Sequence, residues 1–155
     1  MNAKKPEDNK KILRTIAAEL FLQNTVKRFK AAIKEHPAGF TFDIITLQLK
    51  TNFSSEIYLV GQPEHGISFK ADPRQNDLKT WIYNNFSAIC KSGGIIGGWN
   101  SDGILFLDVV AVISGYENAM LSGQVNGEEA IYHPYSSSSI KVTAPQIDTY
   151  LSGDA

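Results

Sequence analysis

The stretch Gly97-Gly98-Trp99-Asn100-Ser101-Asp102-Gly103-Ile104-Leu105-Phe106-Leu107-Asp108-Val109 predicts two apolar strands joined by a tight polar turn. The turn is expected at Asn100 to Gly103, because Asn and Asp side chains bond their own backbone and Gly tolerates positive φ. The second strand is apolar on both faces, which indicates a strand inside the sheet. Asp108 is the exception, a carboxylate in the most hydrophobic run of the chain. Because burying an unpaired charge is costly, we expect Asp108 to meet a donor or to line a polar cavity.

Length and composition indicate one compact globular domain with an appendage: 155 residues, of which 43% are hydrophobic and 20% charged. The net charge of −1 argues against binding to duplex nucleic acid, which needs a surface that neutralises phosphates. Cys90 is the single cysteine, so an internal disulfide is excluded and a cytoplasmic location is expected. Residues 1–11 lack the apolar segment of a signal peptide, and no apolar run approaches the roughly 20 residues of a membrane span, so no membrane partner is expected.

Residues 6–35 are predicted to be helical, with two apolar stripes. The first stripe consists of Leu13, Ile16, Ala17 and Leu20, and the second of Leu22, Val26, Phe29 and Ile33. Because the stripes are rotated by roughly 150° from each other, either one helix faces two partners or the helix breaks near residues 23–25. Both alternatives leave more apolar surface than a small sheet covers. Residues 1–38 are therefore predicted to be an anchoring or oligomerisation segment, with packing on their own domain as the alternative.

The rest of the chain contains predicted strands and two helices. Besides the hairpin, strands are expected at 39–43, 56–60, 67–69 and 129–133, a helix from Asp72-Pro73 to Lys91, and a helix over about 116–125 after a capping box at 114–117. This order predicts an α+β fold, in which an N-terminal helical anchoring segment precedes a small, mainly antiparallel sheet with two packed helices. Residues 39–145 are the predicted ligand-binding core, and residues 146–155 a frayed tail.

Catalytic and metal-binding patterns are weak in this sequence. His36, His65 and His133 lie far apart in the chain and form no zinc-binding pair. Cys90 lies next to an apolar stripe in a predicted helix, which favours a packed thiol over a nucleophile. The glycines at 93–98 follow a helix and precede a strand, which is the reverse of a dinucleotide fingerprint. We therefore predict no catalytic residue, no metal and no cofactor, and favour a binding protein over an enzyme.

Trp99 is a candidate for ligand stacking, because it ends a glycine-rich strand beside a turn, where an indole can lie half exposed. A ring in such a place can stack on a nucleobase, which is worth about 1–3 kcal/mol in nucleic-acid complexes. The simpler alternative is that Trp99 covers the core.

Three groups of residues form a familiar pattern: Gly39-Phe40-Thr41 with Tyr58-Leu59-Val60, Gly97-Gly98-Trp99 with Leu107-Asp108-Val109, and Ala130-Ile131-Tyr132 after a short helix. Over residues 39–142 the chain resembles the phage Thoeris anti-defence sponges of the first described kind, whose core reads GGW…YLDV…AIYD. The N-terminal helices match that family's anchoring region in kind only. The resemblance implies a non-catalytic, oligomeric protein that binds and sequesters glyco-cyclic ADP-ribose signals. Some members also hold cyclic oligonucleotides at separate sites.

The signal pocket of that family lies between subunits and uses an aromatic ring, a polar side chain from the following strand, and arginines. Trp99 matches the aromatic position that stacks on adenine, and Asp108 the polar position that accepts hydrogen bonds from the base or a ribose hydroxyl. Where the family often has a basic residue, this chain has Asn126-Gly127-Glu128-Glu129, so Asn126 and Glu128 are the candidate ligand contacts there. The positive charge for a pyrophosphate is assigned to Arg74, with Lys91 or Lys141 as alternatives.

The leading prediction is a cytoplasmic, homo-oligomeric phage protein, a dimer or larger, that sequesters a cyclic nucleotide immune signal without degrading it. Two alternatives remain. One is a phage or mobile-element protein that inhibits a host defence protein by direct protein–protein binding, and its mark is an exposed apolar or charged patch. The other is a signal-cleaving enzyme that uses carboxylates such as Asp43, Asp108 and Glu128, and its mark is degraded nucleotide.

Overall fold

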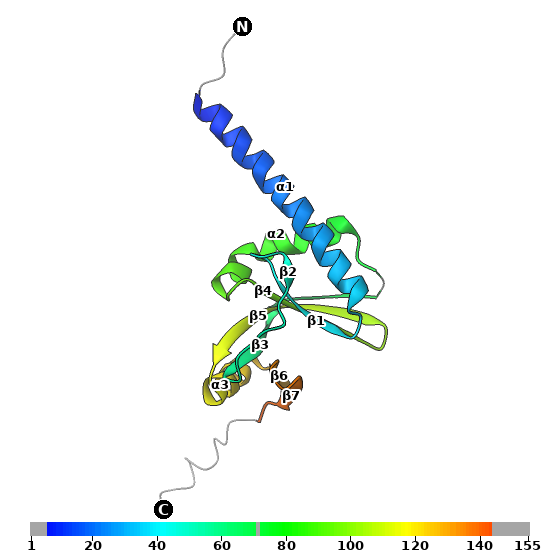
Figure 1. Ribbon diagram of the computed structural model, residues 1–155, viewed down its shortest axis with the longest axis vertical. Coiled ribbons are helices and arrows are strands. Elements are labelled where there is room, and N and C mark those ends of the chain that lie inside the picture. The colour runs from blue at the N-terminus through cyan, green and yellow to red at the C-terminus, as the bar shows by residue number, and fades with distance from the viewer. Residues whose placement is uncertain (1–5, 71, 144–155) are drawn as a thin grey trace, which may run out of the picture.

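The computed structural model of the chain describes residues 6–70 and 72–143 and has an α+β fold (Figure 1). The predicted tail at 146–155 lies outside the described residues. The elements are α1 (Pro6–Glu35), β1 (Gly39–Asp43), β2 (Gln48–Leu49), β3 (Ile57–Phe69), α2 (Gln75–Lys91), β4 (Ile95–Ser101), β5 (Ile104–Ser114), α3 (Tyr116–Asn126), β6 (Ala130–His133) and β7 (Ser138–Lys141). The strands form one sheet in the order β2-β1-β4-β5-β3-β6-β7, and every pairing between described strands is antiparallel. The predicted fold class is confirmed.

The predicted hairpin forms as β4 and β5 and lies at the centre of the sheet. Asp102 and Gly103 have φ values of 51° and 78°, so the two central residues of the turn are left-handed, as a two-residue type I′ hairpin requires. Along β5 the side chains alternate between the two faces of the sheet. Leu105, Leu107 and Val109 point to what we call the helix face, and Phe106 and Asp108 to what we call the Asp108 face.

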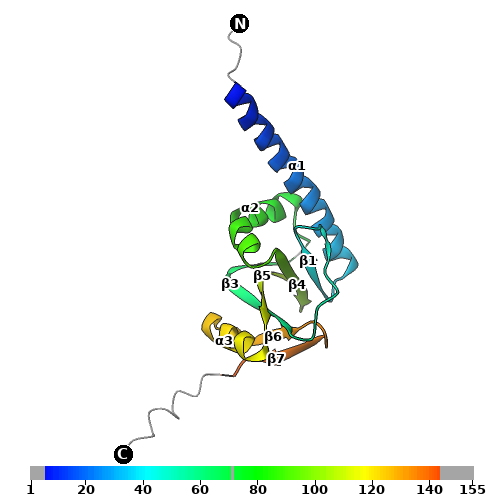
Figure 2. The ribbon, with the colours of Figure 1, turned by 60° about the vertical axis from the view of Figure 1, so that its left-hand side comes forward.

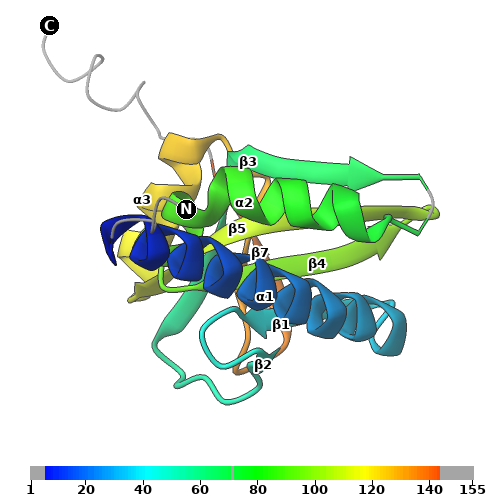
Figure 3. The ribbon, with the colours of Figure 1, turned by 90° about the horizontal axis from the view of Figure 1, so that it is seen from above.

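The helix face carries the main core. α1 and α2 lie side by side over it (Figure 3), and Phe29 of α1 and Leu78 and Ile82 of α2 are fully buried against the strands. α3 covers a further part of this face at the β6–β7 end of the sheet, where Ala119 packs on Val60 (Figure 2). On the other face, Leu59, Ile95 and Val110 form a smaller cluster with the half-buried Phe53.

α1 is one continuous helix, so the predicted break near residues 23–25 does not occur. Its second stripe is buried: every buried residue of the helix lies at Leu22 or beyond it. Its first stripe is exposed, with Leu13, Ile16 and Leu20 retaining 65%, 50% and 61% of their accessible surface. Residues 6–18 therefore project beyond the domain with an uncovered apolar stripe, whereas Glu19 and Phe21 contact Lys79 and Phe86 (Figure 1).

Three local predictions were wrong. The predicted strands at 56–60 and 67–69 are parts of one strand, β3, which continues through Pro63 by means of a bulge. The capping box at 114–117 does not form, because Gly115 is the N-cap of α3 and makes no side-chain cap bond. Cys90 is exposed, so its thiol is not packed in the core. No helix among the described residues is long and apolar enough to cross a membrane.

Candidate functional site

Asp108 occupies an irregular place in the sheet. On one side it pairs with Gly97 of β4, and on the other side β3 pairs Gln62 with Val109 and Ile67 with Leu107. The four residues 63–66 therefore lie opposite the single residue Asp108 and form an irregular bulge. The bulge is held to α2, because Trp81 Nε1 donates to the carbonyl oxygen of His65 at 2.8 Å. The half-buried Asp108 thus faces displaced backbone, where a regular strand would have placed a side chain.

Two glycines of β3 make room for Asp108 and for a second carboxylate. A Cβ atom on Gly66 would lie 2.5 Å from Asp108 Oδ1. A Cβ atom on Gly61 would lie 3.1 Å from Asp108 Oδ2 and 3.0 Å from Glu128 Oε1, so the two carboxylates are neighbours across this glycine. Asn126 joins the group, since its Nδ2 donates to the carbonyl oxygen of Gly61 at 3.1 Å. The structure therefore brings together three of the five site residues predicted from the sequence.

Burial and neighbouring negative charge favour the protonated form of both carboxyl groups. Burial, and secondarily the charge of Glu128, raise the pKa of Asp108 from 3.8 to about 7. Burial, and secondarily the charge of Glu129, raise the pKa of Glu128. Among the described residues neither carboxylate forms an ion pair; the ion pair that is present joins Lys79 to Glu19. Near neutral pH the two carboxyl groups can therefore offer both a hydrogen-bond donor and acceptors to a ligand.

Trp99 lies on the same face as Asp108. It pairs directly with Phe106, and the two rings are stacked, with centroids 5.5 Å apart and planes inclined by 14°. Because Asp108 is two residues beyond Phe106, Trp99 and Asp108 are diagonal neighbours, typically about 7–8 Å apart. The indole is 41% exposed, so one ring surface remains open to solvent. Phe106 was not predicted as part of the site, although it lies two residues before Asp108 in a predicted strand and was therefore expected on the same face.

The surface between the indole and the carboxylate is lined by backbone. Gly97 pairs with Asp108, and Gly39 pairs with Trp99 across β1 and β4. A Cβ atom on Gly39 would make only ordinary contacts, at 3.5 Å and beyond, whereas one on Gly97 would lie 3.2 Å from Val110 Cγ1. A planar ligand could therefore approach the sheet closely here.

The cations predicted to bind phosphate lie elsewhere. Arg74 is the exposed N-cap residue of α2, on the helix side of the sheet, where its backbone nitrogen donates to Asp77. Lys91 lines a groove between α2 and Gln62, also on the helix side. Lys141 pairs with Ala130 on β7, and the pairing of Leu59 with Tyr132 places it on the Asp108 face, at the edge of the sheet. Within one chain, Lys141 is the one of the three that shares a face with Trp99 and Asp108.

The two best-defined cavities among the described residues are not lined by Trp99 or Asp108. One, of about 310 Å³, lies at the hairpin tip, and the other, of about 400 Å³, lies between α2 and β3. Asp43 is occupied in a turn, where its Oδ1 accepts from the backbone of Ile45 at 2.8 Å, so it is separate from the pair of Asp108 and Glu128. Within residues 6–70 and 72–143, no group of three or more His, Cys, Asp or Glu side chains could hold a metal ion.

Comparison of the chain with protein-family models, with curated proteins and with solved structures gives no match.

Proposed function

We propose that this protein binds and sequesters a small cyclic nucleotide signal of the glyco-cyclic ADP-ribose type, without degrading it, as an anti-defence sponge. The observation that carries the proposal is the arrangement of Trp99 and Asp108 as diagonal neighbours on one sheet face. An exposed indole can stack on the adenine ring, and the carboxyl pair can bond the ring edge or a ribose hydroxyl. The resemblance of the sequence to the Thoeris sponges supplies the identity of the ligand.

Tight binding at this site needs a cover, because neither cavity of the single chain includes Trp99 or Asp108. Small ligands are held best when most of their surface is buried. In our proposal the partner subunit of a homo-oligomer closes the Asp108 face over the ligand and contributes the cation that meets the phosphates. Arg74 and Lys91 could act there only from a second copy, whereas Lys141 could act from the same copy.

The exposed apolar surface of α1 supports self-association. We define the α1 stripe as Ile12, Leu13, Ile16, Leu20 and Phe21, which are between 38% and 65% exposed. Phe21 also contacts Phe86 of α2, with ring centroids 6.1 Å apart, so the stripe continues onto the domain. A two-fold dimer would use this patch twice and bury on the order of 1,000 Å², which is near the lower limit for a specific interface.

Calorimetric titration of the full chain with a panel of cyclic ADP-ribose isomers and cyclic di- and trinucleotides tests the binding proposal. We expect one isomer to bind, and intact ligand to be recovered after the complex is denatured. Binding of no member of the panel would refute the proposal, and recovery of a cleaved product would favour a signal-cleaving enzyme.

Trp99→Ala tests the stacking role within that experiment. Loss of base stacking should weaken binding of the signal about tenfold or more. Tyr83→Ala is the matched control, because Tyr83 is an aromatic residue on α2 that is 68% exposed and lies on the helix side. Full affinity in Trp99→Ala, or an equal loss in Tyr83→Ala, would contradict stacking on Trp99.

A further inference from the structure

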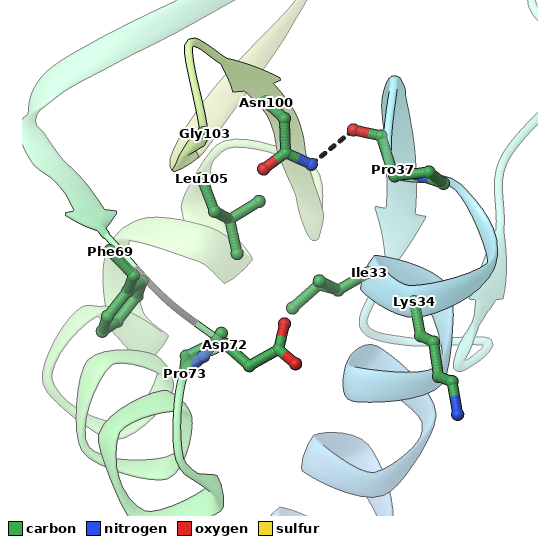
Figure 4. Close-up of a pocket in the computed structure, with 9 residues that line it drawn as sticks. All are labelled: Ile33, Lys34, Pro37, Phe69, Asp72, Pro73, Asn100, Gly103 and Leu105. Carbon is green, nitrogen blue, oxygen red and sulfur yellow. Dashed lines mark hydrogen bonds between the residues drawn. The ribbon is translucent and has the colours of Figure 1, made fainter.

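The cavity at the hairpin tip lies on the helix face, away from Trp99 and Asp108. It measures about 310 Å³ and is bordered by the end of α1, the β4–β5 hairpin and residues 69, 72 and 73 (Figure 4). Its apolar walls come from all three parts: Ile33 from α1, Leu105 from β5 and Phe69 from the end of β3. A volume of this size suits a small ligand.

The side chains of Asn100 and Asp72 offer acceptor oxygens at this cavity. Asn100 Nδ2 donates to the carbonyl oxygen of Pro37, which fixes the amide and leaves its Oδ1 as an acceptor (Figure 4). The Asp72 carboxylate points toward Ile33 across the opening, whereas the ammonium group of Lys34 points away from it. Among the described residues Asp72 forms no ion pair. The cavity therefore presents a carboxylate, an amide oxygen and an aromatic wall, Phe69, to whatever enters it.

We propose that this cavity binds an organic cation, a primary ammonium or guanidinium group on a short apolar stem. The cationic group would donate charge-assisted hydrogen bonds to Asp72 and a hydrogen bond to Asn100 Oδ1. The stem would pack on Ile33 and Leu105, and Phe69 would add attraction between the cation and its ring. The same chemistry is carried by a free amine and by a Lys or Arg side chain of a protein, so the probes must separate these two sources.

The proposal is independent of the cyclic nucleotide site. Trp99 and Asn100 are consecutive in β4, so their side chains point to opposite faces of the sheet. Failure of the amine to bind would leave the nucleotide proposal unaffected, and the reverse also holds.

Titration of the isotopically labelled full chain, followed by NMR signals of Ile33, Leu105 and Asn100, tests the proposal. The probes are agmatine as a free cation, Nα-acetyl-lysine methylamide as a peptide-borne ammonium, and 1-pentanol as an uncharged stem. We expect saturable shifts with at least one cation and much weaker shifts with pentanol. Stronger binding of agmatine would identify a free amine as the ligand, and stronger binding of the lysine derivative would identify a protein side chain.

Asp72→Asn should weaken the binding of the cation about tenfold, because it removes the charge from the hydrogen bond. Asp102→Asn is the matched control: it makes the same change in net charge at an exposed residue of the hairpin tip, outside the cavity lining. Lys34→Gln should strengthen binding by about twofold, because it removes a neighbouring positive charge. Absence of shifts with both cations, equal binding of pentanol, or equal losses in Asp72→Asn and Asp102→Asn would each overturn the proposal.

Discussion

At the scale of single residues, Asp108 shows how a carboxylate is accommodated in an apolar strand. No lysine or arginine neutralises it within the described residues. Instead, the bulge opposite it and the glycines at 61 and 66 leave space, and burial raises its pKa to about 7. Below about pH 7 the residue is therefore tolerated mainly as the neutral acid.

The raised pKa has a consequence for stability. Because the folded chain binds the proton of Asp108 more tightly than the unfolded chain does, the contribution of Asp108 to the free energy of unfolding falls as the pH rises from 3.8 to about 7. At pH 8, Asp108→Asn should raise the free energy of unfolding by about 1–2 kcal/mol, a value reduced for solvent screening because Asp108 is only half-buried. At pH 4 the gain should vanish. Urea unfolding of both proteins at the two pH values measures this difference.

Asp102→Asn is the control for that measurement, since Asp102 is exposed and lies in the hairpin turn. It should leave the dependence of stability on pH close to that of the wild-type chain. A gain from Asp108→Asn that is as large at pH 4 as at pH 8, or an Asp108→Asn variant destabilised equally at both values, would contradict the role of the buried acid.

At the scale of elements, the sequence predicted what depends on neighbouring residues and missed what depends on distant ones. Alternation along β5 and the turn residues at 100–103 are local signals, so the hairpin followed from them, whereas the shared face of Trp99 and Asp108 depends on the register that the turn sets. The contact between Asp108 and Glu128 could not be predicted from spacing, because β3 lies between them in the sheet. Pro63 suggested a break between two strands. In the structure the strand continues through a bulge, which contacts with β5 and with Trp81 of α2 hold in place, and such distant contacts cannot be predicted from local sequence.

The hairpin also depends on a close contact between β1 and β4. A Cβ atom on Gly98 would lie 2.4 Å from Phe40 Cζ, and that ring is held against Phe29, with centroids 5.7 Å apart. We expect Gly98→Ala to lower the free energy of unfolding by about 1–3 kcal/mol through overpacking. Gly39→Ala is the control in the neighbouring strand, and its free energy should change by less than about 0.5 kcal/mol. Equal effects of the two substitutions in urea unfolding would show that the Phe40 contact is not the cause.

At the scale of the whole molecule, the two faces of the sheet have different tasks. The helix face is covered by α1, α2 and α3 and supplies most of the buried core. The Asp108 face is covered only in part, by the cluster around Leu59 and Phe53, and carries the aromatic pair, the glycines and the carboxyl pair. Polar residues on the less covered face can therefore be substituted without loss of the main core.

The free part of α1 leads to the last prediction. Residues 6–18 extend beyond the domain as part of this continuous helix, and a partner that covered their apolar side chains would remove them from water. If that partner is a second copy, Leu13→Ser with Leu20→Ser should convert the dimer or larger oligomer to a monomer in size-exclusion chromatography with light scattering. The domain should remain folded, because both leucines lie outside the buried core. Leu121→Ser is the control, since Leu121 is 60% exposed on α3, and it should leave the oligomer intact. A wild-type chain that is monomeric at micromolar concentration, or an oligomer that survives the double substitution, would exclude assembly through the α1 stripe.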